Sequence, residues 1–189
     1  VLKDAIERSY QKVGWDLRNS ESEKGVFPTF FDLLDILTGV IEESHYSKDT
    51  QSDYVGALCT RVKSLTNGIY GSVLCAEDAL SDAEMFDQNV IVDLSRVGSM
   101  ETKSLLMGIL VMKLQEYRMC SSGMNSRLRH VTVLEEAHNL LRKTSAEQSQ
   151  EGANLQGKSV EMLANAIAEM RTYGEGFIIA DQAPGLLDM

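Results

Sequence analysis

The second half of the chain alternates short apolar runs with longer segments of helical periodicity. Three aliphatic runs, at 89–94, 130–135 and 176–181, contain too few polar residues for half-exposed strands. Such runs are typical of strands that are buried on both faces of a parallel sheet. The segments between them, about 100–118 and 155–172, repeat apolar residues at the spacing of an amphipathic helix. We therefore predict three parallel strands joined by helical crossovers.

Apolar stripes at helical spacing also dominate the first half of the chain. Thr29 followed by Asp32 is a capping signature, and an apolar stripe begins directly after it. Residues 53–65 carry a further stripe, and Asn-Gly-Ile-Tyr-Gly at 67–71 predicts a turn. We interpret these stripes as hydrophobic core and this half as a helical subdomain.

Polar side chains follow each of the three apolar runs. They are Asp93 and Ser95, then Glu135 and Glu136, then Asp181 and Gln182. In open α/β sheets, ligands bind at the carboxyl ends of the strands, so we expect these side chains at one shared edge. Nucleotide hydrolases use two adjacent acids at this place, one for Mg²⁺ and one for the attacking water. The alternative is that Glu135 and Glu136 are a solvated pair opening a helix, where carboxylates suit the helix dipole.

Two longer motifs carry a family resemblance. Val-Leu-Glu-Glu-Ala-His-Asn-Leu-Leu at 133–141 and Arg-Thr-Tyr-Gly-Glu-Gly-Phe-Ile-Ile-Ala-Asp-Gln-Ala-Pro at 171–184 resemble HerA-type ATPases. These belong to the P-loop superfamily of DNA-pumping hexamers that also holds the FtsK translocases and the VirB4-type ATPases. The resemblance implies an α/β fold, with a partial P-loop (RecA/ASCE-like) core of three parallel strands and flanking helices at 89–189. A helical subdomain at 1–88 would precede this core.

The resemblance also implies roles for individual residues. Glu135 resembles the Walker B acid, which would hold Mg²⁺ mostly through water, and Glu136 resembles the catalytic glutamate. Gln182 resembles the residue that senses the γ-phosphate, and Arg171 resembles an arginine finger that acts in trans. For Arg171, the alternative is an arginine near a helix C-terminus that the dipole favours. VirB4-type proteins more often carry Asp-Glu-Ala-Trp, so Glu-Glu-Ala-His favours HerA.

The function that the resemblance implies is that of a fragment of an ATP-hydrolysing motor, a hexameric HerA-like DNA translocase or helicase. Its cofactors would be ATP and Mg²⁺, and the full-length protein would act on DNA as a homo-oligomer, with a nuclease or effector as a further partner. Two alternatives stay open: a VirB4-type conjugation or secretion ATPase, and a non-enzymatic acidic helical module that recognises a partner. The isolated fragment is expected to be inactive.

A formal match to the phosphate-loop pattern G-x-x-x-x-G-K-[ST] lies at Gly152–Ser159. A true loop of this kind follows a buried strand, whereas the polar residues at 142–151 cannot form one. The family also places its loop upstream of the acids. We therefore interpret residues 143–157 as a polar surface loop. The chain begins within a helical pattern and ends soon after Asp181, so we expect both ends to be cut from a larger protein.

Composition narrows the choice of function and location. A net charge of −10 and a pI near 4.8 argue against a broad nucleic-acid-binding face. Three cysteines without metal-ligand spacing indicate buried or free thiols in a reducing compartment. There is no signal peptide and no long apolar run, so we expect a cytoplasmic protein without membrane insertion. Among the histidines, His130 is interpreted as structural. His138 orients the acids, couples to a neighbouring subunit or merely opens a helix.

Overall fold

The computed structural model describes residues 1–76, 78–141, 150–182, 185 and 187. Their contacts divide the chain into two compact units, Val1–Ala79 and Leu80–Met189. Residues 80–88, which we assigned to the helical half, thus belong to the second unit. Within the described part of the chain, no helix is long and apolar enough to cross a bilayer.

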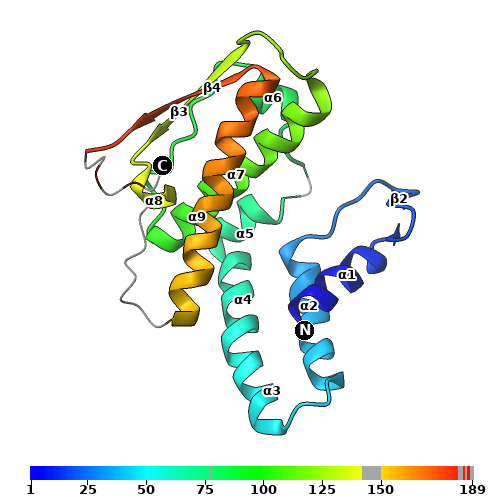
Figure 1. Cartoon of the computed structure of the whole chain (residues 1–189). Coiled ribbons are helices and arrows are strands. Elements are labelled where there is room, and N and C mark those ends of the chain that lie inside the picture. The colour runs from blue at the N-terminus through cyan, green and yellow to red at the C-terminus, as the bar shows by residue number, and fades with distance from the viewer. Residues whose placement is uncertain (77, 142–149, 183–184, 186, 188–189) are drawn as a thin grey trace. The chain divides into compact units, whose positions relative to one another are not determined.

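The first unit is helical, apart from a small hairpin (Figure 1). Its elements are α1 (Leu2–Lys12), β1 (Trp15–Asp16), β2 (Glu21–Ser22), α2 (Phe30–Glu43), α3 (Lys48–Tyr54), η1 (Val55–Cys59), α4 (Thr60–Thr66) and α5 (Gly68–Leu74). Ala5, Leu37 and Ile41 are fully buried where α1 packs on α2. The predicted capping signature is confirmed, because the backbone N–H of Thr29 donates to Asp32 Oδ2 at 2.9 Å.

The helical stripe predicted at 53–65 is confirmed, with the π-helical turn η1 between α3 and α4. One local prediction for this unit is wrong. The expected turn at 67–71 is the start of α5. Gly71 serves close packing: a Cβ on it would lie 2.1 Å from the carbonyl oxygen of Thr66. Only glycine allows the backbone of α5 to approach the end of α4 so closely.

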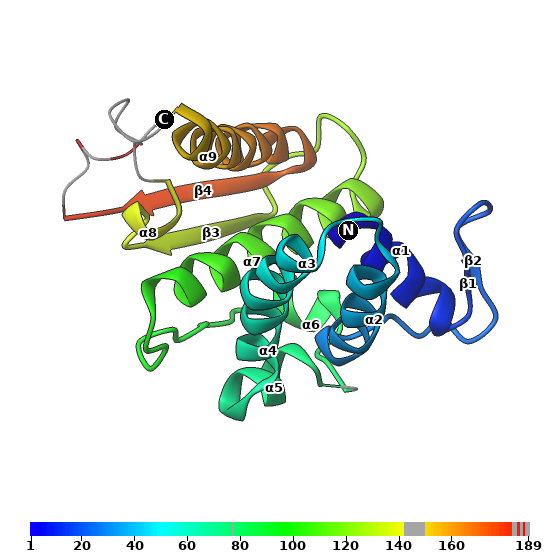
Figure 2. The same ribbon diagram turned by 90° about the horizontal axis from the view of Figure 1, so that it is seen from below.

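The second unit contains a parallel strand pair covered by helices. Its elements are α6 (Asp82–Phe86), α7 (Met100–Ser121), β3 (His130–Glu135), α8 (His138–Leu141), α9 (Gln150–Met170), η2 (Arg171–Tyr173) and β4 (Glu175–Ala180). The predicted parallel pairing of the last two apolar runs is confirmed, with a register from His130↔Glu175 to Glu135↔Ala180. Figure 2 shows β3 and β4 running in the same direction.

The strand pair packs on one face only. Leu134, Phe177 and Ile179 pack against the helical core, whose buried members include Val111, Leu114, Leu141, Val160 and Met170. On the other face Val131, Val133 and Ile178 are exposed. The prediction of strands buried on both faces is therefore wrong for the described structure. An apolar run shows that both faces of a strand could be buried. Whether one face or both are covered depends on which other elements pack against the strand.

The prediction of a third strand at 89–94 is also wrong. These residues form no ladder with β3 or β4, and Ile91 is 94% exposed. A strand exists only through hydrogen bonds to a neighbour, and an aliphatic sequence cannot supply that neighbour. Among the described residues, the three-strand P-loop core that the resemblance implies is thus represented by two strands.

The polar surface loop expected at 143–157 is wrong from residue 150 onward, because α9 begins at Gln150. Glutamate, alanine, leucine, glutamine and lysine in this stretch are good helix formers, and their propensity offsets the two glycines. Residues 142–149 lie outside the described residues.

A buried carboxylate connects both strands to the helices. Glu175, the first residue of β4, accepts hydrogen bonds from Arg118 Nε at 2.8 Å and from Thr132 Oγ1 at 2.7 Å. Its Oε1 atom also lies 2.8 Å from Nδ1 of His130. Arg118 in turn donates to Asp87 Oδ1 at 2.6 Å. The pKa of Asp87 lies below its ordinary value, first because the Tyr117 hydroxyl donates to it and then because Arg118 does.

This network should carry much of the stability of the second unit. The Glu175 side chain is fully buried and that of Arg118 is 6% exposed. Arg118→Met would leave a buried carboxylate without its cation, so we expect a loss of about 3–5 kcal/mol in the free energy of unfolding. The measurement is urea unfolding together with hydrogen exchange of the β3 and β4 amides.

The matched control is Lys113→Met on the same helix. Lys113 pairs with Asp82 at 2.9 Å, but both side chains are more than 40% exposed. Solvent screens this pair, so we expect a change of at most about 1 kcal/mol. Equal effects of the two substitutions would show that the Glu175 network is not the anchor of this unit.

Candidate functional site

The parallel register brings two pairs of predicted site residues to one edge. Glu135 is the last residue of β3 and lies beside Ala180, the last residue of β4. The chain continues into Glu136 on one side and into Asp181 and Gln182 on the other. Glu135, Glu136 and Gln182 are all exposed there. The expectation that these polar side chains share the carboxyl edge of the sheet is met by the backbone pairing alone.

Glu136 has an unusual backbone conformation. Its φ is +50°, in the left-handed region that side chains other than glycine, asparagine and aspartate seldom occupy. The next residue, Ala137, is fully buried, and its carbonyl accepts hydrogen bonds from the amides of Leu140 and Leu141. The strained residue thus makes the sharp turn from β3 into α8. Such strain is found preferentially at functional sites, where it fixes the direction of a side chain.

Asp181 joins the two strand ends. One of its oxygens, Oδ2, accepts the backbone N–H of His138 at 2.8 Å and lies 2.8 Å from Nδ1 of the same residue. The Asp181 side chain is 1% exposed and that of His138 is 30% exposed. A carboxylate at the end of β4 therefore caps the helix that follows β3. The sequence analysis had not identified Asp181 as the partner of His138, and the three roles considered for His138 stay predictions.

Lys103, in the first turn of α7, is a further cation at this edge. Its Nζ atom lies 3.7 Å from Glu136 Oε2. The pKa of Asp93 lies below its ordinary value, mainly because the backbone N–H and the hydroxyl of Ser95 donate to it, with a smaller contribution from Lys103. Lys103 therefore acts electrostatically on Asp93 as well as on Glu136, although the segment at 89–94 is not a strand. The sequence analysis missed Lys103, which lies in the helix that follows the first apolar run.

Arg171 lies at the opposite edge. It opens η2, which precedes β4, so the length of the strand separates it from Glu135 and Glu136. Six residues at about 3.3 Å each give a separation on the order of 20 Å. Within one copy of the chain, the structure therefore does not bring Arg171 together with the other predicted site residues.

The turn after Arg171 is held by the loop that precedes β3. Gly174 has a φ of +83°, and its carbonyl accepts the backbone N–H of Arg129 at 2.8 Å. A Cβ at this position would lie 2.4 Å from the carbonyl oxygen of Arg127. Only glycine fits here, so the glycine of the Arg-x-Tyr-Gly motif fixes the position of Arg171.

The residues at the acidic edge fit Mg²⁺ only as a partly hydrated ion. Among the described residues, no group of three or more metal-binding side chains could hold a metal. Mg²⁺ commonly keeps several waters and uses one or two carboxylates together with phosphate oxygens. Glu135 and Glu136 can supply such carboxylates. The formal phosphate-loop match at residues 152–159 lies within helix α9, so it is not a strand-to-helix loop that could cradle phosphates.

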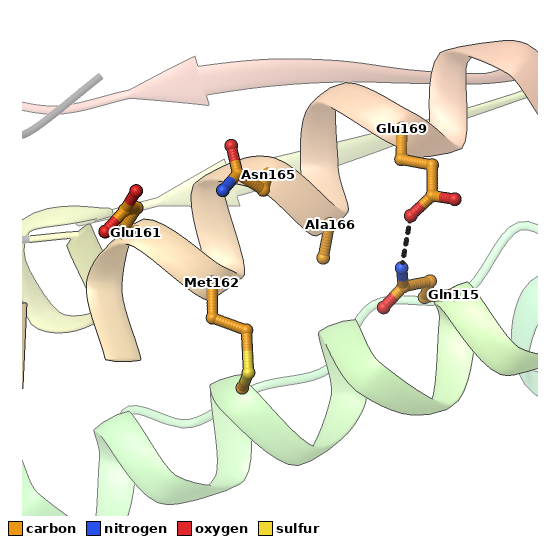
Figure 3. A pocket seen from close by; sticks show the side chains of 6 residues that line it. All are labelled: Gln115, Glu161, Met162, Asn165, Ala166 and Glu169. Carbon is orange, nitrogen blue, oxygen red and sulfur yellow. Dashed lines mark hydrogen bonds between the residues drawn. The ribbon is translucent and has the colours of Figure 1, made fainter. Parts of the chain in front are cut away.

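A shallow groove of about 370 Å³ between α7 and α9 is separate from this edge. Gln115 of α7 donates to Glu169 of α9 at 2.9 Å. Figure 3 shows this bond, with Met162 of α9 pointing toward α7 farther along the groove. None of the described residues that line the groove is a predicted site residue, so we do not assign it to the site.

No family model matches this chain, and neither does any curated protein or solved structure. The family resemblance therefore stays a prediction from the motifs.

The strain at Glu136 can be measured. Glu136→Gly and Glu136→Ala both remove the carboxylate, but only glycine adopts a positive φ without cost. We expect the glycine variant to be more stable than the alanine variant by about 1 kcal/mol. At Glu161, an exposed position within α9, the same pair should show the opposite order, because glycine weakens a helix. The same order at both positions would contradict a strained Glu136.

The packing of the Arg171 turn gives a second test. Gly174→Ala combines a positive φ with a collision against backbone, so we expect a loss of at least about 2 kcal/mol in thermal or urea unfolding. Gly108→Ala in α7 is the control, since its Cβ would meet Leu140 Cδ1 at an ordinary 3.8 Å. That variant should be neutral or stabilised by up to about 1 kcal/mol.

Proposed function

We propose that this chain supplies the acidic strand and the sensor strand of an ATP-hydrolysing motor of the HerA type. The observation that carries the proposal is the parallel register of β3 and β4, which sets Glu135 and Glu136 beside Asp181 and Gln182. In an open α/β sheet this edge is where ligands bind. The order of the motifs along the chain supports the same assignment. The phosphate-binding loop would lie outside the described residues.

The proposed roles follow from position and chemistry. Glu135 would hold Mg²⁺ through water, and bound Mg²⁺ would neutralise charge on the phosphate oxygens. Glu136, exposed and directed by its left-handed turn, would take the proton of the attacking water. Gln182 would donate its amide N–H to the terminal phosphate. Arg171 would act on the site of a neighbouring copy, because the strand length keeps it from its own acids.

The wider assembly belongs to the same proposal. A trans arginine requires a homo-oligomer, and the family precedent is a hexamer that moves DNA, with a nuclease or effector as a further partner. The acidic charge of the chain confines DNA contacts to local basic residues. Cys59, Cys75 and Cys120 are free thiols, which supports a reducing, cytoplasmic location.

The decisive experiment compares the two acids in the full-length protein. Glu136→Gln keeps the shape of the side chain but cannot accept a proton, so ATP should still bind while kcat falls by about 10² to 10⁴. Glu135→Gln removes a metal-linked carboxylate, so nucleotide affinity and Mg²⁺ dependence should weaken together. ATP binding by calorimetry and turnover by phosphate release separate the two effects.

Lys158→Ala is the matched control for this experiment. Because Lys158 belongs to a helix, its loss should leave ATP hydrolysis within severalfold of the unmodified protein. Normal turnover in Glu136→Gln would show that the acid pair is a solvated helix start and would favour the non-enzymatic module. Abolition of turnover by Lys158→Ala alone would show that the order of the nucleotide-binding elements is misassigned.

A further inference from the structure

We propose that Asp181 is a positioning residue, which sets the direction of Glu136 by holding the start of α8 against the end of β4. The two residues lie on different segments, and hydrogen bonds to His138 connect them. The position of Glu136 can be measured without any activity. Its meaning for ATP hydrolysis rests on the proposed function, in which Glu136 takes the proton of the attacking water.

The turn after β3 is held at both ends by two consecutive residues of the other strand segment. Before the turn, Glu135 pairs with Ala180 in the parallel ladder. After the turn, the backbone N–H of His138 donates to Oδ2 of Asp181 at 2.8 Å. Only two residues lie between these anchored positions, and the first of them is Glu136.

This anchoring forces the backbone to turn sharply. In an extended chain, positions 135 and 138 would lie about 10 Å apart, because each residue adds about 3.3 Å. The residues that anchor them, Ala180 and Asp181, are neighbours whose Cα atoms are about 3.8 Å apart. The chain must therefore fold back within two residues. Glu136 makes this turn with a φ of +50°, a conformation that only glycine adopts without strain.

Asp181 is suited to hold the turn because it is buried and contacts one residue twice. Its side chain is 1% exposed, and Oδ2 also lies 2.8 Å from Nδ1 of His138. An ionised carboxylate only accepts hydrogen bonds, so Nδ1 of the ring donates to it. Bonds to a charged acceptor that is shielded from water are stronger than bonds between neutral groups at the surface. They can therefore hold Glu136 in a conformation that is unfavourable for glutamate.

The same geometry links Glu136 to the residue proposed to contact the terminal phosphate. Gln182 directly follows Asp181 in the chain. A displacement of Gln182 when the phosphate leaves would pull on Asp181. Through His138, this pull would reach the turn that directs Glu136. The glutamate would then point at the attacking water only while the end of β4 is in place.

Hydrogen bonds within α8 are the alternative support for the turn. The carbonyl of Ala137 accepts the amides of Leu140 and Leu141. These bonds are local to α8, whereas the bonds of Asp181 join α8 to the neighbouring strand. The two explanations differ in the energetic coupling that they predict between Asp181 and Glu136. A double-mutant cycle measures this coupling directly.

The test is such a cycle in the whole chain, followed by urea unfolding. In the unmodified chain, Asp181→Ala loses its hydrogen bonds but lets Glu136 relax, so part of the loss is offset. In the Glu136→Gly background the strain is already gone, and nothing is regained. Asp181→Ala should therefore lower the folding equilibrium constant by a factor at least about fivefold larger in the Glu136→Gly background. Equal factors in the two backgrounds would overturn the proposal.

Three further variants control this cycle. Thr132→Val removes a hydrogen bond between the strands at their opposite end, so its effect should be equal in both backgrounds. Asp181→Asn keeps an oxygen that can accept the same two bonds, so it should restore most of the stability that alanine loses. His138→Ala removes the ring contact and keeps the backbone N–H, so its coupling to Glu136→Gly should be smaller and of the same sign. This milder variant decides the question if Asp181→Ala does not fold.

NMR reports the conformation of the turn itself. A positive φ brings the amide and α protons of a residue close together, so residue 136 should show a strong NOE between them in the unmodified chain and in Asp181→Asn. This NOE should weaken in Asp181→Ala. An unchanged NOE in folded Asp181→Ala would contradict the proposal, because the turn would then form without Asp181.

In the full-length protein, a misdirected Glu136 should affect turnover more than binding. Asp181→Ala should lower kcat at least about tenfold with little change in ATP affinity, and Asp181→Asn should restore most of the turnover. The outcomes remain separable from those of the proposed function. Coupling together with normal turnover in Glu136→Gln would retain the positioning role and remove the ATPase. Loss of turnover in Glu136→Gln without coupling would retain the ATPase and remove the positioning role.

Discussion

The second unit depends on one buried carboxylate at the start of a strand. Glu175 accepts hydrogen bonds from α7 and from β3 while it belongs to β4, so it joins three elements that are far apart in the sequence. An unpaired carboxylate in this place would be very unfavourable, and its hydrogen bonds to Arg118 and Thr132 are made in a register that aligns His130 with Glu175. A polar interaction therefore sets the register of an otherwise aliphatic strand pair, where side-chain volume alone would discriminate weakly.

The register decides which chemistry meets at each end of the strands. With His130 opposite Glu175, the acids after β3 come out beside Asp181 and Gln182, and the arginines before both strands gather at the other end. A shift of one residue would turn Glu135 toward the helices and Val133 with it. The charge asymmetry of the unit is thus a consequence of parallel pairing, since parallel strands place all their amino ends together and all their carboxyl ends together.

The acidic edge shows local strain held in place by satisfied contacts around it. Glu136 adopts a left-handed conformation, while Ala137 directly after it is fully buried and His138 is bonded twice to Asp181. The buried residues after Glu136 determine where α8 begins. The backbone of Glu136 therefore adopts the left-handed conformation that connects β3 to α8. Buried, hydrogen-bonded neighbours thus hold an exposed side chain in an unfavourable backbone conformation. Such local strain lowers stability but fixes the direction of the side chain.

Sequence and tertiary structure contributed to different parts of this picture. The aliphatic runs at 130–135 and 176–181, the long amphipathic helices and the Thr29 capping signature were predictable, because each depends on the periodicity or chemistry of neighbouring residues. The run at 89–94 has the same composition but forms no strand, because pairing requires a partner that composition does not specify. That helices cover only one face of the strand pair could not be predicted either, because composition does not specify which elements pack there.

For the candidate site, too, some features were predictable from the sequence and others were decided by the tertiary structure. The sequence by itself determined that Glu135, Glu136 and Gln182 lie at the ends of aliphatic runs. In a parallel sheet, these positions lie at the carboxyl edge. Only the tertiary structure decided that Lys103 faces Glu136, that Asp181 holds His138, and that Arg171 lies a strand length away from the acids. The physical reason is that a motif encodes the direction of its own backbone, whereas the partner of a charged side chain depends on which distant segments the core brings beside it.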